Sequence, residues 1–504
     1  MPVRTFRQEV RMQRSSGILL HPTALPGPYG IGSLGIDAVR FVHFLAEAGQ
    51  QVWQILPLGP TGYGHSPYNA LSAFAGNPLL IDVEQLVRVG DLSAGDLHGC
   101  RFAEGRVDDQ ALARRSLILV QAGRRFLQNA SSPRQHEFRT FCQEHAAWLE
   151  DYALFMAIRD HFNQASWSSW PEELRCRQPE ALAKWRDQLA AEMDLQRYQQ
   201  FIFFQQWLEL KEYANSSGIR ILGDIPIFVA YDSADVWSRQ ELFQLDEAGR
   251  PLAVAGVPPD YFSETGQRWG NPLYDWPTLE EQDFAWWLDR FRHNLLCTDL
   301  VRIDHFRGFE ACWSIPAGAE TAVKGHWETV PGARFFTRLQ QEFPDLPVIA
   351  EDLGDITPEV EKLRRDFGFP GMKILQFAFD SGPDNPYLPK NYEPDFVVYT
   401  GTHDNNTTLG WWQSLTRAER RPVMAALGKT RPDIPWDLIE MAEMSLADLC
   451  ILPCQDILSL GAEARFNTPG TVDGNWTWRL ATGDLTSTLA QRLRHLCEQT
   501  DRVA

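Results

Sequence analysis

Four carboxylates follow short apolar segments of the chain. These residues are Asp224, Asp304, Glu351 and Asp404. If the apolar segments are parallel strands of one barrel, their carboxyl ends lie on a common rim and the carboxylates converge in one cleft. Such a cleft suits the chemistry of a glycosidic bond, which needs a nucleophile, a general acid and base, and a third group that holds the distorted sugar.

The segment 298–308, TDLVRIDHFRG, shows the pattern most clearly. Alternation along a strand puts Arg302 and Asp304 on the same face. In a sheet covered on both sides an isolated charge is expensive, so we expect this pair to be used in chemistry or paired with other groups. The alternative is that Asp304 only caps the following helix, and for this residue alone the sequence favours neither interpretation.

A divalent metal is the main alternative use of such carboxylates, because hard cations bind oxygen clusters. Arg302 beside Asp304 would repel a cation, so we expect no metal, and we expect no cofactor. The chain has no GxSxG, HExxH, P-loop or nicotinamide-binding motif.

Eight apolar segments alternate with helical patterns. They are 17–20, 51–56, 219–225, 298–304, 347–350, 372–377, 396–399 and 450–453. This alternation predicts an α/β fold, a (β/α)8 TIM barrel in one large domain. An open doubly wound sheet is the alternative, and the lack of a glycine-rich phosphate motif after the first strand disfavours it.

Two long segments are expected to be insertions in a single catalytic domain that spans residues 15–504. Residues 81–198 have charged, helical patterns and predict an inserted, mainly helical subdomain. An insertion at about 230–280 includes the Gly-rich and Pro-rich segment 258–277, which predicts an irregular loop at the active site. Residues 1–14 are expected to be a disordered extension.

Composition excludes several classes of partner. The 504 residues carry a formal net charge of -19, which disfavours nucleic acid and anionic membranes. No apolar run predicts a signal peptide or a membrane span. The eight cysteines show no CxxC pair or zinc-ligand spacing, so we expect reduced, structural cysteines and a cytoplasmic location.

Three segments resemble a known family. VRIDHFRGF (301–309), IAEDLG (349–354) and GTHDN (401–405) are similar to the catalytic segments of the amylomaltases, the 4-alpha-glucanotransferases of glycoside hydrolase family 77. Further similarity lies at 15–32, 60–70, 223–237, 255–276 and 465–479, and so spans nearly the whole chain. The resemblance implies a barrel with insertions around the active site and no separate C-terminal β-domain.

The resemblance implies a role for each catalytic carboxylate. Asp304 would be the nucleophile, Glu351 the acid and base, and Asp404 the stabiliser of the transition state. Arg302 favours an ionised Asp304, and the environment of Glu351 should raise its pKa. The reaction would retain the anomeric configuration through a covalent glycosyl-aspartate.

The remaining candidate residues would bind substrate. Asp224 would orient Arg302, and His305 and His403 would donate to sugar hydroxyls rather than serve as structural histidines. The segment 258–276, with Tyr261 and Trp269, is expected to exclude water and stack on the acceptor. By the same resemblance Tyr63, Gln267, Asp380 and Asn475 are candidate sugar contacts.

The implied activity moves a segment of a 1,4-alpha-glucan donor to the 4-hydroxyl of glucose or a maltooligosaccharide acceptor, by a monomer or weak oligomer. The alternatives are an alpha-glucan hydrolase of the amylase clan and a glucan-binding protein without activity. Two departures from the family pattern, His65 and Asn406, stand where an acidic residue is usual, and they bear on subsite preference.

Overall fold

The wall of the molecule is an eight-stranded parallel sheet with the strand order β10-β11-β12-β1-β2-β3-β6-β9. The computed structural model describes residues 14–259, 263–471 and 473–503. The strands are β1 (Ser15–Leu19), β2 (Val52–Gln54), β3 (Arg220–Pro226), β6 (Leu300–Asp304), β9 (Val348–Ala350), β10 (Gly371–Ile374), β11 (Phe396–Tyr399) and β12 (Leu449–Pro453). Each predicted strand segment contains a strand, but residues 375–377, predicted as the end of the sixth strand, form a 3-10 helix instead.

The two strands at the ends of this order are neighbours. The amide of Ala350, in β9, donates to the carbonyl of Pro370 just before β10, at 2.8 Å. The sheet therefore closes on itself, and the predicted (β/α)8 barrel is confirmed. The carboxyl ends of its strands share one rim, as expected for parallel strands in a closed barrel.

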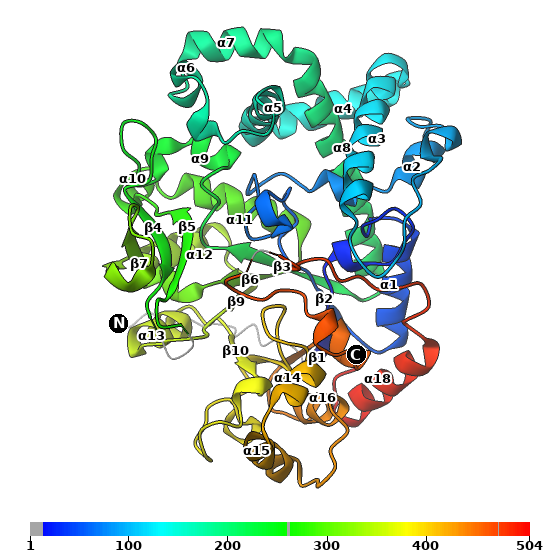
Figure 1. Ribbon diagram of the computed structural model, residues 1–504, viewed down its shortest axis with the longest axis vertical. Helices are drawn as coiled ribbons and strands as arrows, with labels where there is room; N and C mark the ends of the chain where they lie inside the picture. The colour runs from blue at the N-terminus through cyan, green and yellow to red at the C-terminus, as the bar shows by residue number, and fades with distance from the viewer. Residues whose placement is uncertain (1–13, 260–262, 472, 504) are drawn as a thin grey trace, which may run out of the picture.

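Helices cover the outside of this wall (Figure 1). They include α1 (Ile36–Glu47), α11 (Ala285–Cys297), α12 (Gly332–Glu342), α13 (Pro358–Asp366), α14 (Thr408–Ser414), α15 (Arg417–Leu427), α16 (Trp436–Glu443) and α18 (Ser487–Gln499). Local sequence sets several of the boundaries. Pro358 occupies the first turn of α13, where its missing N–H costs nothing, and the Thr416 and Glu419 side chains form a capping box at the start of α15.

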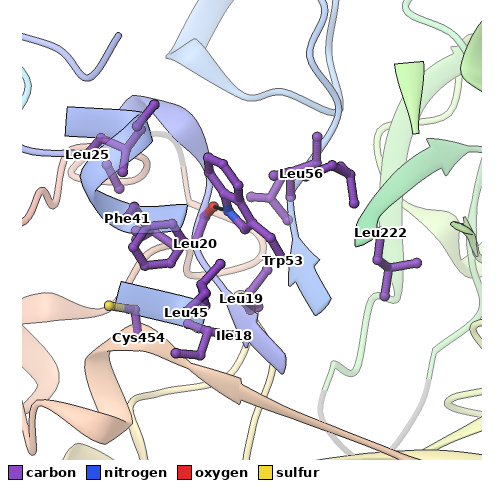
Figure 2. Close-up of a cluster of buried hydrophobic side chains, with 14 of the residues drawn as sticks. Ile18, Leu19, Leu20, Leu25, Phe41, Leu45, Trp53, Leu56, Leu222 and Cys454 are labelled. Atoms are coloured by element: carbon purple, nitrogen blue, oxygen red, sulfur yellow. Dashed lines mark hydrogen bonds between the residues drawn. The ribbon is translucent and has the colours of Figure 1, made fainter. Parts of the chain in front are cut away.

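A core between β1, β2 and α1 holds this part of the barrel together (Figure 2). The ring of Trp53 is fully buried, lies edge-on to Phe41 at a centroid distance of 5.0 Å, and donates from Nε1 to the carbonyl of Leu20 at 2.7 Å. Full burial of one large apolar side chain contributes roughly 1.5–3 kcal/mol to folding. The indole N–H keeps its hydrogen bond, so its burial carries no unpaired donor.

Helices fill the segment between β2 and β3, above the strands in Figure 1. They are α2 (Val83–Arg88), α3 (Asp109–Asn129), α4 (Ser132–Glu144), α5 (Ala146–His161), α6 (Glu172–Arg175), α7 (Pro179–Gln188) and α8 (Ala190–Ser216). The 27 residues of α8 run through residue 198 without a break and return the chain to β3. The expected insertion and the barrel therefore share this helix.

A second, antiparallel sheet has the strand order β5-β4-β7-β8. Its strands are β4 (Ala253–Val257), β5 (Gln267–Pro272), β7 (Ala311–Pro316) and β8 (His326–Thr329). The prediction of irregular structure throughout 258–277 is wrong for β5. Gly256 explains the pairing, because a Cβ there would stand 2.1 Å from the carbonyl oxygen of Gln267, so only glycine permits this approach of the strands.

The expected N-terminal extension lies outside the described residues, apart from Arg14. The guanidinium of Arg14 donates to the carbonyls of Thr500 and Glu443, at 2.8 and 3.0 Å. Within the described ranges, no helix has both the length and the apolar composition needed to cross a bilayer.

Candidate active site

Arg302 joins two of the rim carboxylates. Its Nη1 lies 2.6 Å from Asp224 Oδ2, and its Nη2 lies 2.8 Å from Asp304 Oδ1. The register of β3 against β6 causes this, since Asp224 pairs with Arg302 in the ladder and Asp304 is the last residue of β6. Asp224 and Arg302 are almost fully buried. The guanidinium thus lies between these two carboxylates.

Glu351 follows β9 and is held by two backbone amides. His305 N donates to its Oε2 at 2.7 Å, and Leu353 N donates to its Oε1 at 3.2 Å. The first bond depends on the left-handed backbone of His305, at φ 51° and ψ 51°. Burial, and next the charge of Asp304, raise the pKa of Glu351 to about 8. This carboxyl is therefore protonated at neutral pH.

Asp404 follows β11 and has 43% of its side chain accessible, compared with 28% for Asp304. Asn467 Nδ2 donates to its Oδ1 at 2.6 Å, and His403 Nε2 lies 3.4 Å from the same oxygen. Arg465 Nη2 donates to the backbone carbonyl of Asp404 at 2.7 Å. A segment near the end of the chain therefore fixes a carboxylate that stays open to a ligand.

Tyr68 belongs to the site and was missed in the sequence. Its hydroxyl donates to Asp224 Oδ2 at 2.6 Å, and its ring stacks on His403 at 5.1 Å and an interplanar angle of 12°. Trp476 lies within 6.1 Å of the Tyr68 ring and 6.0 Å of the His403 ring. The available signal was its place in the segment 60–70, PTGYGHSPYNA.

The two predicted histidines lie in this cluster and are neutral. Burial lowers the pKa of His305 to about 4, and burial also lowers the pKa of His403. Nε2 of His305 is buried and has no hydrogen-bond partner among the residues that the structure describes. A neutral imidazole with a free ring nitrogen can donate to or accept from a sugar hydroxyl.

The second sheet brings two more predicted residues to the rim. The Trp269 ring, on β5, meets the His305 ring edge-on at a centroid distance of 4.8 Å. Gln267 Oε1 accepts a hydrogen bond from Trp269 Nε1 at 3.1 Å. Trp269 is 38% exposed, so its ring remains available to a ligand. Tyr261 lies outside the described residues.

Three further candidates are less closely linked to the carboxylates. Asn475 accepts from Thr468 N at 2.9 Å and shapes the turn that leads to Trp476. Asp380 Oδ1 accepts from Asn385 Nδ2 at 3.0 Å, and in the described parts of the chain no hydrogen bond joins Asp380 to the four rim carboxylates. Tyr63 begins the short 3-10 turn that follows β2.

The arrangement combines an ion-paired carboxylate, Asp304, with a nearby carboxyl group of raised pKa, Glu351. Asp304 is ion-paired with Arg302, whereas the raised pKa of Glu351 lets this carboxyl keep a proton that it can give to a leaving group. Enzymes that break a glycosidic bond use one ionised carboxylate and one protonated carboxyl group.

Comparisons with known proteins agree with this geometry. A family model described as 4-alpha-glucanotransferase matches residues 20–486. The 4-alpha-glucanotransferase of Thermus thermophilus is 51% identical over 503 residues, which cover 98% of this chain and 100% of that protein. The enzyme of the same name from Synechocystis sp. is 52% identical over 492 residues, or 96% of this chain and 97% of that protein. The solved amylomaltase from Streptococcus agalactiae in complex with acarbose matches with a TM-score of 0.94 at 39% identity, covering 98% of this chain and 100% of that one. The chain therefore belongs to the 4-alpha-glucanotransferases of glycoside hydrolase family 77.

Proposed function

We propose that this enzyme moves a segment of a 1,4-alpha-glucan to the 4-hydroxyl of glucose or a maltooligosaccharide through a covalent intermediate on Asp304. The observation that carries the proposal is the pairing of Asp304 with Arg302 beside a protonated Glu351. In the first step an Asp304 oxygen attacks the anomeric carbon of the donor. The glycosidic bond breaks as Glu351 gives its proton to the departing oxygen.

In the second step the ionised Glu351 takes the proton of the acceptor hydroxyl. The acceptor oxygen attacks the anomeric carbon and the bond to Asp304 breaks, which restores both carboxyl groups. Two displacements retain the anomeric configuration. Asp404, which Asn467 holds in place, accepts hydrogen bonds from sugar hydroxyls that shorten in the oxocarbenium-like transition state.

Other residues orient these groups and bind sugar. Asp224 orients Arg302 by accepting from its Nη1. Tyr68 donates to the same oxygen, Asp224 Oδ2, and so holds that carboxylate in place. His305 and His403 donate to hydroxyls, and Trp269 stacks on a sugar at the acceptor side. The remaining proposed sugar contacts are Tyr63, Tyr261, Gln267, Asp380 and Asn475.

The test uses maltotriose as both donor and acceptor. Products are resolved by chain length while total reducing ends are followed. A series of longer oligosaccharides plus glucose at constant reducing ends supports transfer. Rising reducing ends without longer chains would support an alpha-glucan hydrolase instead. Binding of maltotriose with neither outcome would favour a glucan-binding protein without activity.

We also propose a cytoplasmic location and a monomer or weak oligomer. The eight cysteines are free, which suits a reducing compartment. Light scattering at two protein concentrations tests the oligomeric state, and fractionation of native cells tests the location. A stable tetramer or recovery outside the cytoplasm would contradict these proposals.

A further inference from the structure

Within the described ranges, one junction between neighbouring barrel strands lacks a backbone ladder. Among the described residues, ladders join every other pair of neighbouring barrel strands. The exception is the junction of β9 with β10, here called the seam. The bond from Ala350 N to Pro370 O crosses it at 2.8 Å. Glu351 follows Ala350, so the acid and base of the proposed mechanism stands at the least-bonded junction of the barrel.

Asp352 supplies an acceptor across the seam. Its Oδ1 accepts from Met372 N, in β10, at 2.7 Å, which is the place a strand carbonyl would take in a ladder. Its Oδ2 lies against Gly371, where a Cβ would stand 2.3 Å from that oxygen. The residues before and after Glu351, Ala350 and Asp352, are therefore both hydrogen-bonded across the seam to the segment that contains β10.

A buried arginine holds the Asp352 carboxylate in place. Arg364, on α13, is 1% exposed and its Nε lies 3.3 Å from Asp352 Oδ2. Arg364 Nη1 also donates to the carbonyl of Phe369 at 2.7 Å, and the guanidinium lies 4.8 Å from the centre of the Phe396 ring. Several contacts thus fix the cation, and through it the direction of the carboxylate.

The bonds of Asp352 continue into the Glu351 side chain. Leu353, which directly follows Asp352, donates its amide to Glu351 Oε1 at 3.2 Å. A shift of Asp352 would carry this amide with it, while the second donor, His305 N, belongs to the β6 side of the site. The two donors keep their relative positions only while the seam stays closed.

We propose that Asp352 is a positioning residue that aims the Glu351 carboxyl at the leaving oxygen by closing the seam through Met372 and Arg364. The inference rests on the proposed role of Glu351 as acid and base. A displacement of about 1 Å in a catalytic group can cost about 100-fold in rate. Loss of Asp352 should therefore slow the step that needs the proton of Glu351 far more than it weakens substrate binding.

Two glycosyl-donor substrates distinguish this positioning role from a general structural role. Maltotriose needs a proton on its leaving oxygen, whereas alpha-maltotriosyl fluoride does not, because fluoride departs with the electron pair of the C–F bond as Asp304 attacks. For Asp352→Ala we expect kcat with maltotriose to fall about 30- to 100-fold at a KM within about twofold. The burst rate of fluoride release should stay within about threefold of the parent enzyme.

Two further variants complete the test. Asp352→Asn keeps an oxygen that can accept from Met372 N, so it should recover at least a tenth of the parent kcat with maltotriose. Asp82→Ala is the matched control, because Asp82 likewise accepts backbone amide hydrogen bonds, from Glu84 and Gln85 at the start of α2, which lies away from β9 (Figure 1). Asp82→Ala should lower the unfolding temperature but should not slow maltotriose turnover relative to the fluoride burst.

Equal slowing of both donors in a folded Asp352→Ala variant would overturn the inference. If that variant does not fold, maltotriose turnover and the fluoride burst are compared in Asp352→Asn instead. A fluoride burst like the parent's with slower maltotriose turnover supports the inference, and equal slowing overturns it. Failure of the proposed function can be told apart from failure of this inference. If Asp304 is not the nucleophile, Asp304→Asn will keep the fluoride burst, whatever the Asp352 variants do.

Discussion

At the scale of single residues, the candidate site holds carboxyl groups in different electrostatic surroundings. Arg302 keeps a positive charge next to Asp304, while burial keeps the proton on Glu351. The surroundings make the difference, since the two side chains have almost the same chemistry. The sign of the pH dependence follows from this difference.

The basic limb of the pH profile should report Glu351. The raised pKa of about 8 means that the free enzyme carries the acid proton below that pH and loses it above. We expect kcat/KM for maltotriose to fall about tenfold per pH unit above about pH 8. The fluoride burst should not follow this limb. A maltotriose profile that stays flat to pH 10 would contradict the assignment.

The hydroxyl of Tyr68 should matter separately from its ring. Tyr68→Phe keeps the stacking on His403 but removes the donor to Asp224 Oδ2. A hydrogen bond to a charged group contributes roughly 1.5–3 kcal/mol, so we expect kcat/KM to fall about tenfold or more. Tyr29→Phe, which removes a hydroxyl bonded to Glu84 on the surface, is the control and should leave the rate unchanged. Equal kcat/KM values for the two variants would show that the Tyr68 hydroxyl does not contribute to catalysis.

At the scale of elements, the second sheet distinguishes the described structure from the bare barrel. It places Trp269 against His305 at the rim, although β5 itself lies in a segment full of glycine and proline. We therefore expect this sheet to affect whether a sugar or water acts as the acceptor.

Loss of the Trp269 ring should shift that choice. In Trp269→Ala we expect the ratio of hydrolysis to transfer on maltotriose to rise about three- to tenfold, because water gains access and the acceptor loses a stacking surface worth roughly 1 kcal/mol. Trp327→Ala is the control, since Trp327 is 36% exposed on β8 at the opposite edge of the same sheet. An unchanged ratio for Trp269→Ala would show that the ring does not exclude water.

The sequence predicted the barrel strands because each is a short apolar run between helical patterns. It missed β5, because the pairing depends on β4 and on the space that Gly256 leaves, and a local pattern reports neither. The carboxylates were predictable from their places at strand ends. Tyr68 and Asn467 were not, because their partners Asp224 and Asp404 lie 156 and 63 residues away in the chain.

At the scale of the whole molecule, Arg502 connects residues that lie far apart in the chain. Arg502 is fully buried, lies 3.2 Å from Glu443 Oε2 and donates to the carbonyls of Ser15 and Ala447 at 2.9 and 2.7 Å. Ser15 begins β1 and Ala447 precedes β12. The C-terminus therefore ties the first and last barrel strands together.

Removal of this tie should cost stability without changing the chemistry. For Arg502→Ala we expect a loss of about 3–5 kcal/mol in the free energy of unfolding, because Glu443 is left buried without its charge partner. Urea titration measures the loss, and kcat at 25 °C should match the parent's. Arg40→Ala removes an exposed pair with Asp37 and should change stability by less than about 0.5 kcal/mol. Equal stabilities of the two variants would contradict this account of the C-terminus.

The most direct test of the proposed mechanism is to trap the covalent intermediate. Glu351→Gln lacks the base for the second step, so incubation with alpha-maltotriosyl fluoride should leave one maltotriosyl group on the protein. Peptide mapping by mass spectrometry should place that group on Asp304. A label on Asp224 or Asp404, or fluoride release with no labelled protein at any time, would contradict the assignment of Asp304 as the nucleophile.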